Sequence, residues 1–392
     1  MNERRIREAL QRTPVDAEAR ERSRRVVHAA YRELAPARRP ARARRRLAGL
    51  ALACVAMLAL TVVAVTRTPA DAVAQWLREA VGIEARDASA VLGDVPGGGR
   101  LLVTAGDSAW VVAPDGAKRR LGRYEGASWS PRGLFVVAWQ GGELTALEPD
   151  GDVRWSLRRP EKVETARWAP GDGYRIAYVA GSSLRVVNGD GTGDRRFGEA
   201  LAAVAPAWRP GGEHVLAYLD RAGRVRVADA DSGRVRWRSD RIDEPTALAW
   251  SPRGDRLLVV AAHRMVLFDG RGVQLTTRPL LRSVRAVDVA WSSGREVALV
   301  LAYPAENRSD VALLDHVSGR WCVLFTVPGR LGPVAWSPDG RSLLVSWPDA
   351  NQWLFLRPQG RQRPVRAIED VAAQFAPGTT RARFPSDVVW AP

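Results

Sequence analysis

The chain has 392 residues, and its 46% hydrophobic and 26% charged content is that of a globular protein, which excludes large-scale disorder. Its formal net charge is +16, but residues 1–46 hold fifteen arginines against six acids, so the remaining chain is only mildly basic. The two cysteines, Cys54 and Cys322, lie in different segments, which excludes a disulfide within the large downstream region.

Residues 1–46 are predicted to form a basic cytoplasmic segment with short helices. Thr13, Pro14 and Asp16 are typical of a helix start, and Pro36 ends the apolar periodicity that follows. This helix would either dock a cytoplasmic partner or lie on the inner membrane leaflet. No aromatic residues interleave with the arginines and no helix-turn-helix pattern is evident, so we expect no nucleic-acid partner.

Residues 47–66 are predicted to be a transmembrane helix. The segment reads LAGLALACVAMLALTVVAVT, without a charge, between Arg46 and Arg67. At about 1.5 Å per residue it spans roughly 30 Å, the thickness of a bilayer core, whereas a signal peptide has a shorter apolar stretch and a shorter preceding segment. The arginines on its N-terminal side predict a cytoplasmic N-terminus and an extracytoplasmic C-terminal region.

Residues 67–97 are expected to form a juxtamembrane amphipathic helix and a stalk. Asp71 starts the helix and Gly82 closes it, and Trp76 on its apolar face would lie at the outer membrane interface. The residues that follow, up to Pro96-Gly97-Gly98-Gly99, have the composition of a flexible linker.

A repeat of about 40 residues occupies the remaining chain. Each copy has a Trp, a turn with Pro and Gly, a short apolar run and a second turn. The tryptophans are Trp129, Trp168, Trp208, Trp250, Trp291 and Trp336, separated by 39, 40, 42, 41 and 45 residues. Such a period with strand-rich content is typical of β-propeller blades.

The second turn of the repeat occurs seven times, although only six complete Trp motifs precede it. The seven turns are Asp115-Gly116, Asp150-Gly151, Asp190-Gly191, Ser232-Gly233, Arg271-Gly272, Ser318-Gly319 and Gln359-Gly360. One blade therefore lacks its first strand, and the last residues, with Trp390, supply another copy of it. We predict an all-β fold: a seven-bladed β-propeller over residues 98–392, closed by the C-terminal strand and monomeric.

The segment from Trp336 to Leu344 contains Ser-Pro-Asp-Gly after an aromatic strand, and here the chain resembles the TolB-like, WD-type propellers. Asp150–Leu157 and Asp231–Ser239 are more similar to the Gly-x-x-x-Trp endings of quinoprotein-like propeller repeats. The resemblance covers roughly residues 98 to 392. It implies a propeller fold and an extracytoplasmic, protein-binding component of the bacterial envelope.

Aromatic residues that recur about ten positions after the blade Trp are the candidate binding residues. They would lie on the rim, where they could contact a ligand, or pack between blades. These residues are Trp139, Tyr178, Tyr218, Tyr303 and Trp347. The longest loops are expected at Tyr303–Asp310 and at Ile368–Pro385, the latter with a short helix.

One segment resembles a calcium-binding loop in its spacing, with Asn188, Asp190, Thr192, Gly193 and Glu199 at EF-hand positions. Two arginines inside it and the absence of flanking helices argue against calcium, so we expect no metal and no cofactor.

No metalloprotease, nucleophile-elbow, phosphate-loop or paired-cysteine motif is present. We therefore predict a membrane-anchored extracytoplasmic propeller that binds a protein or ligand and is not an enzyme. One alternative is an extracytoplasmic hydrolase or quinoprotein-like enzyme that uses the central channel, and a ring of acidic or histidine side chains in the channel would favour it. The other alternative is a signalling protein whose N-terminal segment binds a cytoplasmic regulator.

Overall fold

The computed structural model describes residues 92–391 except 172–173, 201–203, 212, 359–364 and 376–381. The predicted basic segment, membrane span and juxtamembrane helix lie outside these residues. Within the described part of the chain, no helix has the length and apolar character to cross a membrane.

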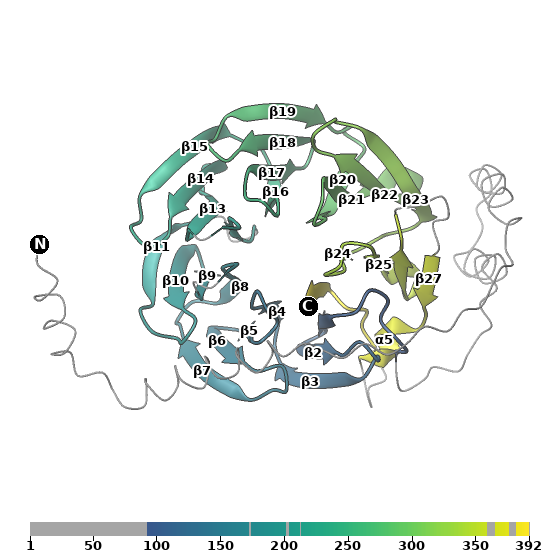
Figure 1. The fold of residues 1–392 in the computed structure, drawn as a ribbon, viewed down its shortest axis with the longest axis horizontal. Helices are drawn as coiled ribbons and strands as arrows, with labels where there is room; N and C mark the ends of the chain where they lie inside the picture. Colours follow the sequence, from purple (N-terminus) through teal and green to yellow (C-terminus); the bar gives the residue numbers. More distant parts are fainter. Residues whose placement is uncertain are drawn as a thin grey trace, which may run out of the picture. The chain divides into compact units, whose positions relative to one another are not determined.

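Seven four-stranded antiparallel sheets surround a central axis as the blades of a propeller (Figure 1). From inner to outer strand, blade 1 holds β28 (Asp387–Ala391), β1 (Arg100–Ala105), β2 (Ser108–Val112) and β3 (Lys118–Arg123). Blade 2 holds β4 (Gly126–Trp129), β5 (Val136–Gln140), β6 (Glu143–Leu147) and β7 (Val153–Arg158). Blade 3 holds β8 (Val163–Trp168), β9 (Arg175–Ala180), β10 (Ser183–Asn188) and β11 (Arg195–Glu199). Blade 4 holds β12 (Ala207–Trp208), β13 (Val215–Leu219), β14 (Arg224–Asp229) and β15 (Val235–Arg241).

The remaining three blades complete the ring. Blade 5 holds β16 (Pro245–Trp250), β17 (Arg256–Ala261), β18 (Arg264–Asp269) and β19 (Gln274–Pro279). Blade 6 holds β20 (Arg285–Trp291), β21 (Glu296–Tyr303), β22 (Arg308–Asp315) and β23 (Trp321–Pro328), with the 3₁₀ helix η1 (Pro304–Glu306) between β21 and β22. Blade 7 holds β24 (Val334–Trp336), β25 (Leu343–Trp347), β26 (Gln352–Leu356) and β27 (Val365–Ile368), with η2 (Pro348–Ala350) before β26 and α5 (Val371–Gln374) after β27.

The C-terminal strand closes the ring, which confirms the predicted fold. β28 pairs antiparallel with β1, and Trp390 lies opposite Leu101 in the register. The Trp390 indole Nε1 donates a hydrogen bond to the Gly98 carbonyl, 2.7 Å away. The first and last described strands therefore share one sheet, and β1 is paired on both sides.

The Ser-Pro-x-Gly turns join the first and second strands for a local reason. In the turn after Trp336, the Gly340 N–H donates to the Ser337 carbonyl and the Ser342 N–H donates to the Ser337 Oγ, at 2.8 and 2.9 Å. Gly340 has φ +67°, a conformation that glycine adopts without the cost that a Cβ brings. The same two bonds recur around Ser251 in blade 5.

The repeated tryptophans connect neighbouring blades. The indole Nε1 of Trp208, Trp250, Trp291 and Trp336 donates to a carbonyl on the inner strand of the preceding blade, at 2.9 to 3.1 Å. The rings of Trp208, Trp250 and Trp336 are also buried between the two sheets, and that of Trp291 is half-buried. The tryptophans recur about every 40 residues because each of these blades makes the same hydrogen bond to the blade before it.

The segment before the first strand differs from the predicted flexible stalk in its last residues. Leu92 and Val95 are buried in the apolar cluster that holds Trp390, and the Val95 N–H donates to the Pro114 carbonyl at 2.8 Å. These two apolar side chains therefore pack with the propeller core, although glycines follow them in the chain.

The two predicted long loops have different outcomes. The loop at Tyr303–Asp310 is a tight connection, since β21 runs to Tyr303, η1 makes one turn and β22 begins at Arg308, so this prediction is wrong. Asn307 takes the left-handed conformation that closes the turn, at φ +48°. The excursion after Ile368 does contain the predicted short helix, α5, and its Val371 is fully buried.

Candidate functional site

The five predicted binding aromatics do not form a surface together. Trp139, Tyr178, Tyr218 and Trp347 are at most 7% exposed and pack between blades, so they offer almost no area to a ligand. Only Tyr303 is partly exposed, and the Arg308 guanidinium covers its ring at 3.5 Å from the centroid. The first four residues therefore pack between blades, which is the second of the two roles considered for them.

Tyr178 belongs to a network of charges that is satisfied internally. Its hydroxyl donates to Asp194 at 2.6 Å, and Arg185 Nη2 donates to the same carboxylate at 2.6 Å. Arg159, which follows the outer strand of the preceding blade, also pairs with Asp194. Two guanidinium groups and a hydroxyl therefore surround one carboxylate, and this arrangement holds blades 2 and 3 together instead of binding a ligand.

The segment with EF-hand spacing does not form a calcium site. Asn188, Asp190 and Thr192 lie in the hairpin turn between β10 and β11 and hydrogen-bond to one another. Glu199, the twelfth position, lies opposite Ser183 at the other end of the hairpin. A ligand from Glu199 cannot reach the turn, because its partner Ser183 is five residue steps from Asn188 along β10, at about 3.3 Å per residue.

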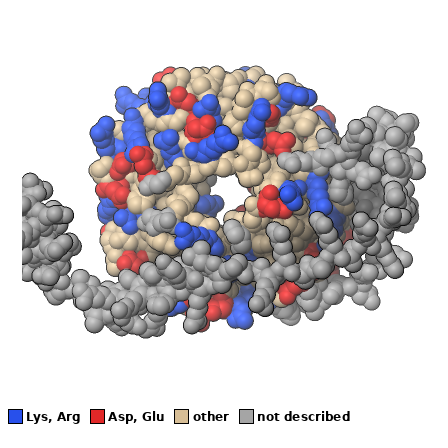
Figure 2. All heavy atoms as spheres, in the orientation of Figure 1, with Lys and Arg blue, Asp and Glu red and all other residues tan. Residues whose placement is uncertain are grey.

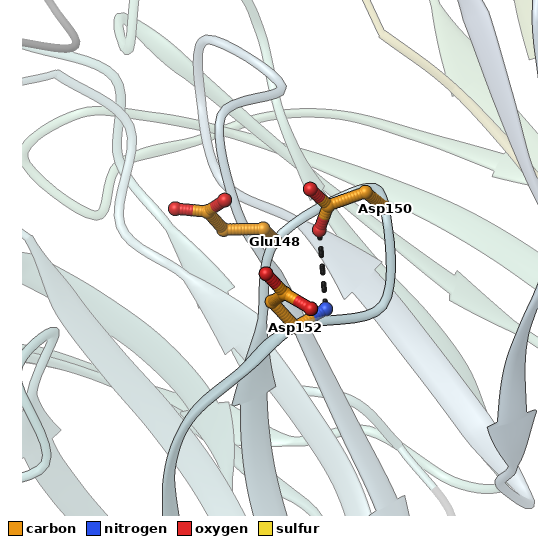
Figure 3. Close-up of side chains that lie close together, drawn as sticks. All are labelled: Glu148, Asp150 and Asp152. Carbon is orange, nitrogen blue, oxygen red and sulfur yellow. Dashed lines mark hydrogen bonds between the residues drawn. The ribbon is translucent and has the colours of Figure 1, made fainter.

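A different acidic group occurs on the turn between β6 and β7. Oxygens of Glu148, Asp150 and Asp152 lie within 4.8 Å of one another, as Figure 3 shows. Asp150 accepts the Asp152 N–H at 3.1 Å, and Arg154 pairs with Glu148. The two aspartates are exposed, and the turn geometry and the arginine account for the arrangement.

The central channel is open in the space-filling view of Figure 2. Charged side chains of the three inner strands β8, β20 and β28 interact electrostatically. Burial raises the pKa of Asp288 on β20 to about 6, and it also raises the pKa of Asp387 on β28. The Val334 N–H of the next blade donates to Asp288 Oδ2 at 2.9 Å, and the guanidinium of Arg167 on β8 acts electrostatically on both carboxylates. None of the inner strands in the described part of the chain contains a histidine.

Exposed apolar side chains are concentrated on blades 5 and 6. Of the eight large apolar residues that are exposed in the described part of the chain, six lie from Val273, just before β19, to β23. Four of these six belong to the outer strands β19 and β23 and the hairpin turns before them, and we call them the blade 5–6 surface: Val273, Leu275, Val317 and Val323. Exposed apolar side chains that cluster on neighbouring elements are typical of a binding surface.

The outer strand of blade 6 lacks the charges that protect the other outer strands. β23 reads WCVLFTVP, whereas β3, β7, β11 and β15 each contain at least two Lys or Arg. Charged side chains on an outer strand prevent other chains from pairing with its free edge. β23 therefore offers an unprotected apolar edge next to the blade 5–6 surface, and it also carries the exposed free thiol of Cys322.

A cavity of about 60 Å³, open on one side, lies between blades 5 and 6. Its lining is mainly apolar, with His316 as a polar group whose Nδ1 is buried and has no hydrogen-bond partner. The Trp291 ring meets the His316 ring edge-on at 5.0 Å, and burial lowers the pKa of the imidazole. The lining residues are Leu258, Met265, Leu267, Thr276, Arg278, Trp291, Val297, Leu314, His316 and Gly319.

Sequence reasoning did not find this cavity or the blade 5–6 surface. The signal available was the Gly-x-x-x-Trp ending, which two blades have and blade 5 lacks, since Thr276 follows Gly272 at that spacing. The uncharged run of β23 was a second signal.

No protein-family model matches the chain, and no curated protein matches it. Solved structures do match. The β-propeller domain of Myceliophteria thermophila Cps50 (Swd1) has 18% identity and a TM-score of 0.53, over 67% of this chain and 94% of that one. A chain of the mitotic checkpoint complex has 16% identity and a TM-score of 0.56, over 71% and 98%. Saccharomyces cerevisiae Sqt1 has 12% identity and a TM-score of 0.54, over 73% and 87%.

At these identities the likeness concerns the fold alone. The chain is a seven-bladed β-propeller with WD40-type structural neighbours. A propeller of this kind is a rigid scaffold that presents surfaces on its two faces and its perimeter, which is consistent with protein binding.

Proposed function

We propose that this chain is a single-pass membrane protein whose propeller lies outside the cytoplasm and binds a protein of the cell envelope without catalysing a reaction. The observation that carries the binding role is the blade 5–6 surface, where exposed apolar side chains, an uncharged outer strand and an open cavity occur together. Apolar area left in water favours association, because covering it contributes about 25 cal/mol per Å².

The location rests on the sequence. The uncharged run of residues 47–66 has the length of a membrane span, and the arginines before it favour a cytoplasmic N-terminus. The resemblance of Trp336–Leu344 to TolB-like repeats supports an envelope role. The non-catalytic role rests on the sequence, in which no metalloprotease, nucleophile-elbow, phosphate-loop or paired-cysteine motif is present.

Site-specific photo-crosslinking in intact cells tests the binding role. A benzophenone amino acid at Val273 or at Val323 should crosslink a partner protein, because both positions lie on the blade 5–6 surface. The matched control is Val153, which follows the corresponding hairpin of blade 2 and is 58% exposed, as Val273 is. Equal crosslinking from all three positions, or none from Val273 and Val323, would contradict the proposal.

Thiol labelling tests the location. Cys322 is exposed on β23, so a membrane-impermeant maleimide should label it in intact cells from which any outer barrier has been removed. Cys322→Ser is the control that identifies the labelled site. Labelling that requires lysis of the cytoplasmic membrane would place the propeller inside the cell and refute the topology.

A further inference from the structure

The outer strands of blades 2, 3 and 4 share one position that bridges to the next blade. It is the fourth residue after the hairpin glycine, and in blades 2, 3 and 4 it is Trp155, Arg195 and Trp237. Trp155 Nε1 donates to the Gly189 carbonyl at 2.8 Å, Arg195 donates to the Ala230 carbonyl, and Trp237 Nε1 donates to the Gly270 carbonyl at 3.3 Å. In each case the acceptor lies at the start of the next blade's outer hairpin turn.

The two indoles fill the space beside the next hairpin. A Cβ added at Gly191 would lie 2.8 Å from the Trp155 ring, and one at Gly272 would lie 2.6 Å from the Trp237 ring. Both tryptophans are half-buried in the groove between two blades. The grooves between blades 2 and 3 and between blades 4 and 5 are therefore each filled by an indole that the chain itself supplies.

Blade 5 departs from this pattern. The fourth residue after Gly272 is Thr276, which pairs with Leu267 in the register that places Trp237 opposite Val227. The side chain is too short to span the groove, and a Cβ at Gly319, the hairpin glycine of blade 6, would meet no atom within 4 Å. The cavity of about 60 Å³ lies here, with Thr276 and Gly319 in its lining.

The groups around the cavity are suited to an aromatic side chain. Met265, Leu267 and Leu314 make the walls apolar, and a thioether is a favourable neighbour of an aromatic ring. His316, which corresponds in blade 6 to the Gly189 and Gly270 positions, has a buried Nδ1 that lacks a partner. Arg278 is held at the edge, where it donates to the Gly319 carbonyl at 2.8 Å and stacks on Trp321.

We propose that the groove between blades 5 and 6 is a socket for an aromatic side chain, tryptophan above all, presented by an extended segment of the partner protein. The partner's indole would take the place that Trp155 and Trp237 fill within the chain itself. This inference rests on the proposed function, since it names the chemistry by which the blade 5–6 surface recognises its partner.

Methyl NMR of the full-length protein tests the socket with a defined probe, N-acetyl-L-tryptophanamide. The chain has three methionines, Met1, Met57 and Met265, of which Met265 lines the cavity. Methionine methyl labelling gives few signals, and the Met265 signal is the one that disappears in Met265→Leu. An inserted ring should shift the Met265 methyl signal saturably and leave the other two unchanged. An unmoved Met265 signal overturns the proposal, as does an equal response to N-acetyl-L-leucinamide.

Two variants of adjacent residues provide the matched comparison. Thr276→Trp supplies the missing indole, so the Met265 signal should be displaced without the probe and its affinity for the probe should fall at least tenfold. Thr277→Trp is the control, because alternate residues of a strand point to opposite faces, and it should keep the wild-type response. Equal probe affinity in the two variants would show that the probe binds elsewhere and would overturn the socket.

The same variants separate the socket from the proposed function. If Thr276→Trp abolishes the Val273 crosslink and Thr277→Trp preserves it, both are supported. If the crosslink persists in Thr276→Trp, the socket is overturned while the binding surface stands. If the probe binds wild-type protein but no crosslink forms at Val273, the socket stands as an aromatic site and the proposed protein-binding function fails.

Discussion

Truncation of Trp390 gives the sharpest test of ring closure. This residue is 9% exposed, its ring meets Phe355 edge-on at 5.8 Å, and its Nε1 donates to Gly98. It lies on β28, the strand that joins the end of the chain to β1. Trp390→Ala therefore removes the largest side chain of the closing strand without deleting any backbone.

The expected loss of stability follows from these contacts. Truncation of a buried Trp or Phe to Ala costs about 3–5 kcal/mol through lost burial and the cavity that remains. Trp390→Phe retains most of the apolar area and loses the hydrogen bond, so it should cost about 1–2 kcal/mol. Because domains are stable by only about 5–15 kcal/mol, Trp390→Ala should remove a large share of the unfolding free energy.

Urea unfolding of the full-length protein, followed by near-ultraviolet circular dichroism, measures both variants. Trp250→Ala is a suitable comparison, because this Trp has the same place on the inner strand of an internal blade and is 6% exposed. Similar losses for Trp390→Ala and Trp250→Ala are expected. A loss below about 1 kcal/mol for Trp390→Ala, with a normal loss for Trp250→Ala, would mean that the C-terminal strand does not close the ring.

Three further predictions concern single sites. Gly99→Ala should destabilise the protein clearly more than Gly98→Ala, although both glycines have positive φ, because only at Gly99 would a Cβ lie 2.3 Å from the Ala391 carbonyl; thermal unfolding of the two variants measures the difference. The pKa of Asp288 is raised to about 6, so the folded state holds a proton more tightly than the unfolded state, and the unfolding free energy should decrease as the pH rises from 4 to 6. Asp288→Asn should remove this decrease, which is at most about 3 kcal/mol, when stability is measured by urea titration at each pH. An unchanged pH profile in the variant would refute this prediction. Backbone N–H groups of its own turn lower the pKa of Asp315 to about 2, so its stabilisation is present above pH 4 and lost toward pH 2; Asp315→Asn should cost about 1–2 kcal/mol at pH 7 and flatten the acid-induced loss.

The ring could be predicted from the sequence because its signals are local. A Ser-Pro-x-Gly turn fixes a hairpin within a few residues, and the Trp before it makes the same contact in successive blades. The count of seven turns against six complete Trp motifs located the closing strand at Trp390 without any knowledge of the register. The helices predicted before the propeller and the predicted membrane span lie outside the described residues.

The candidate site could not be predicted in the same way, because exposure of a strand residue depends on the neighbouring blade. Trp139 and Tyr178 recur at a constant distance from the blade Trp, as rim residues would, yet the adjacent sheet covers them. The sequence predicts a long loop at Tyr303, but Pro304 and the left-handed Asn307 make the connection short. Periodicity identifies equivalent positions and does not say which of them the next blade leaves open.

In a closed ring, a blade that departs from the repeat loses a contact that other blades make. Whether a ligand could use the vacant place depends on whether that place is exposed to solvent. The indole Nε1 atoms of Trp129 and Trp168 are buried without a hydrogen-bond partner, but their rings are at most 7% exposed, so no ligand could use them and the departure is a cost of packing alone. At Thr276 the groove is open to solvent, and the outer strand beside it has lost its charges as well. The missing indole and the missing charges of β23 occur on one accessible surface, as expected where binding of a partner outweighs the protein's own stability. The groove between blades 5 and 6 is therefore the place to test first.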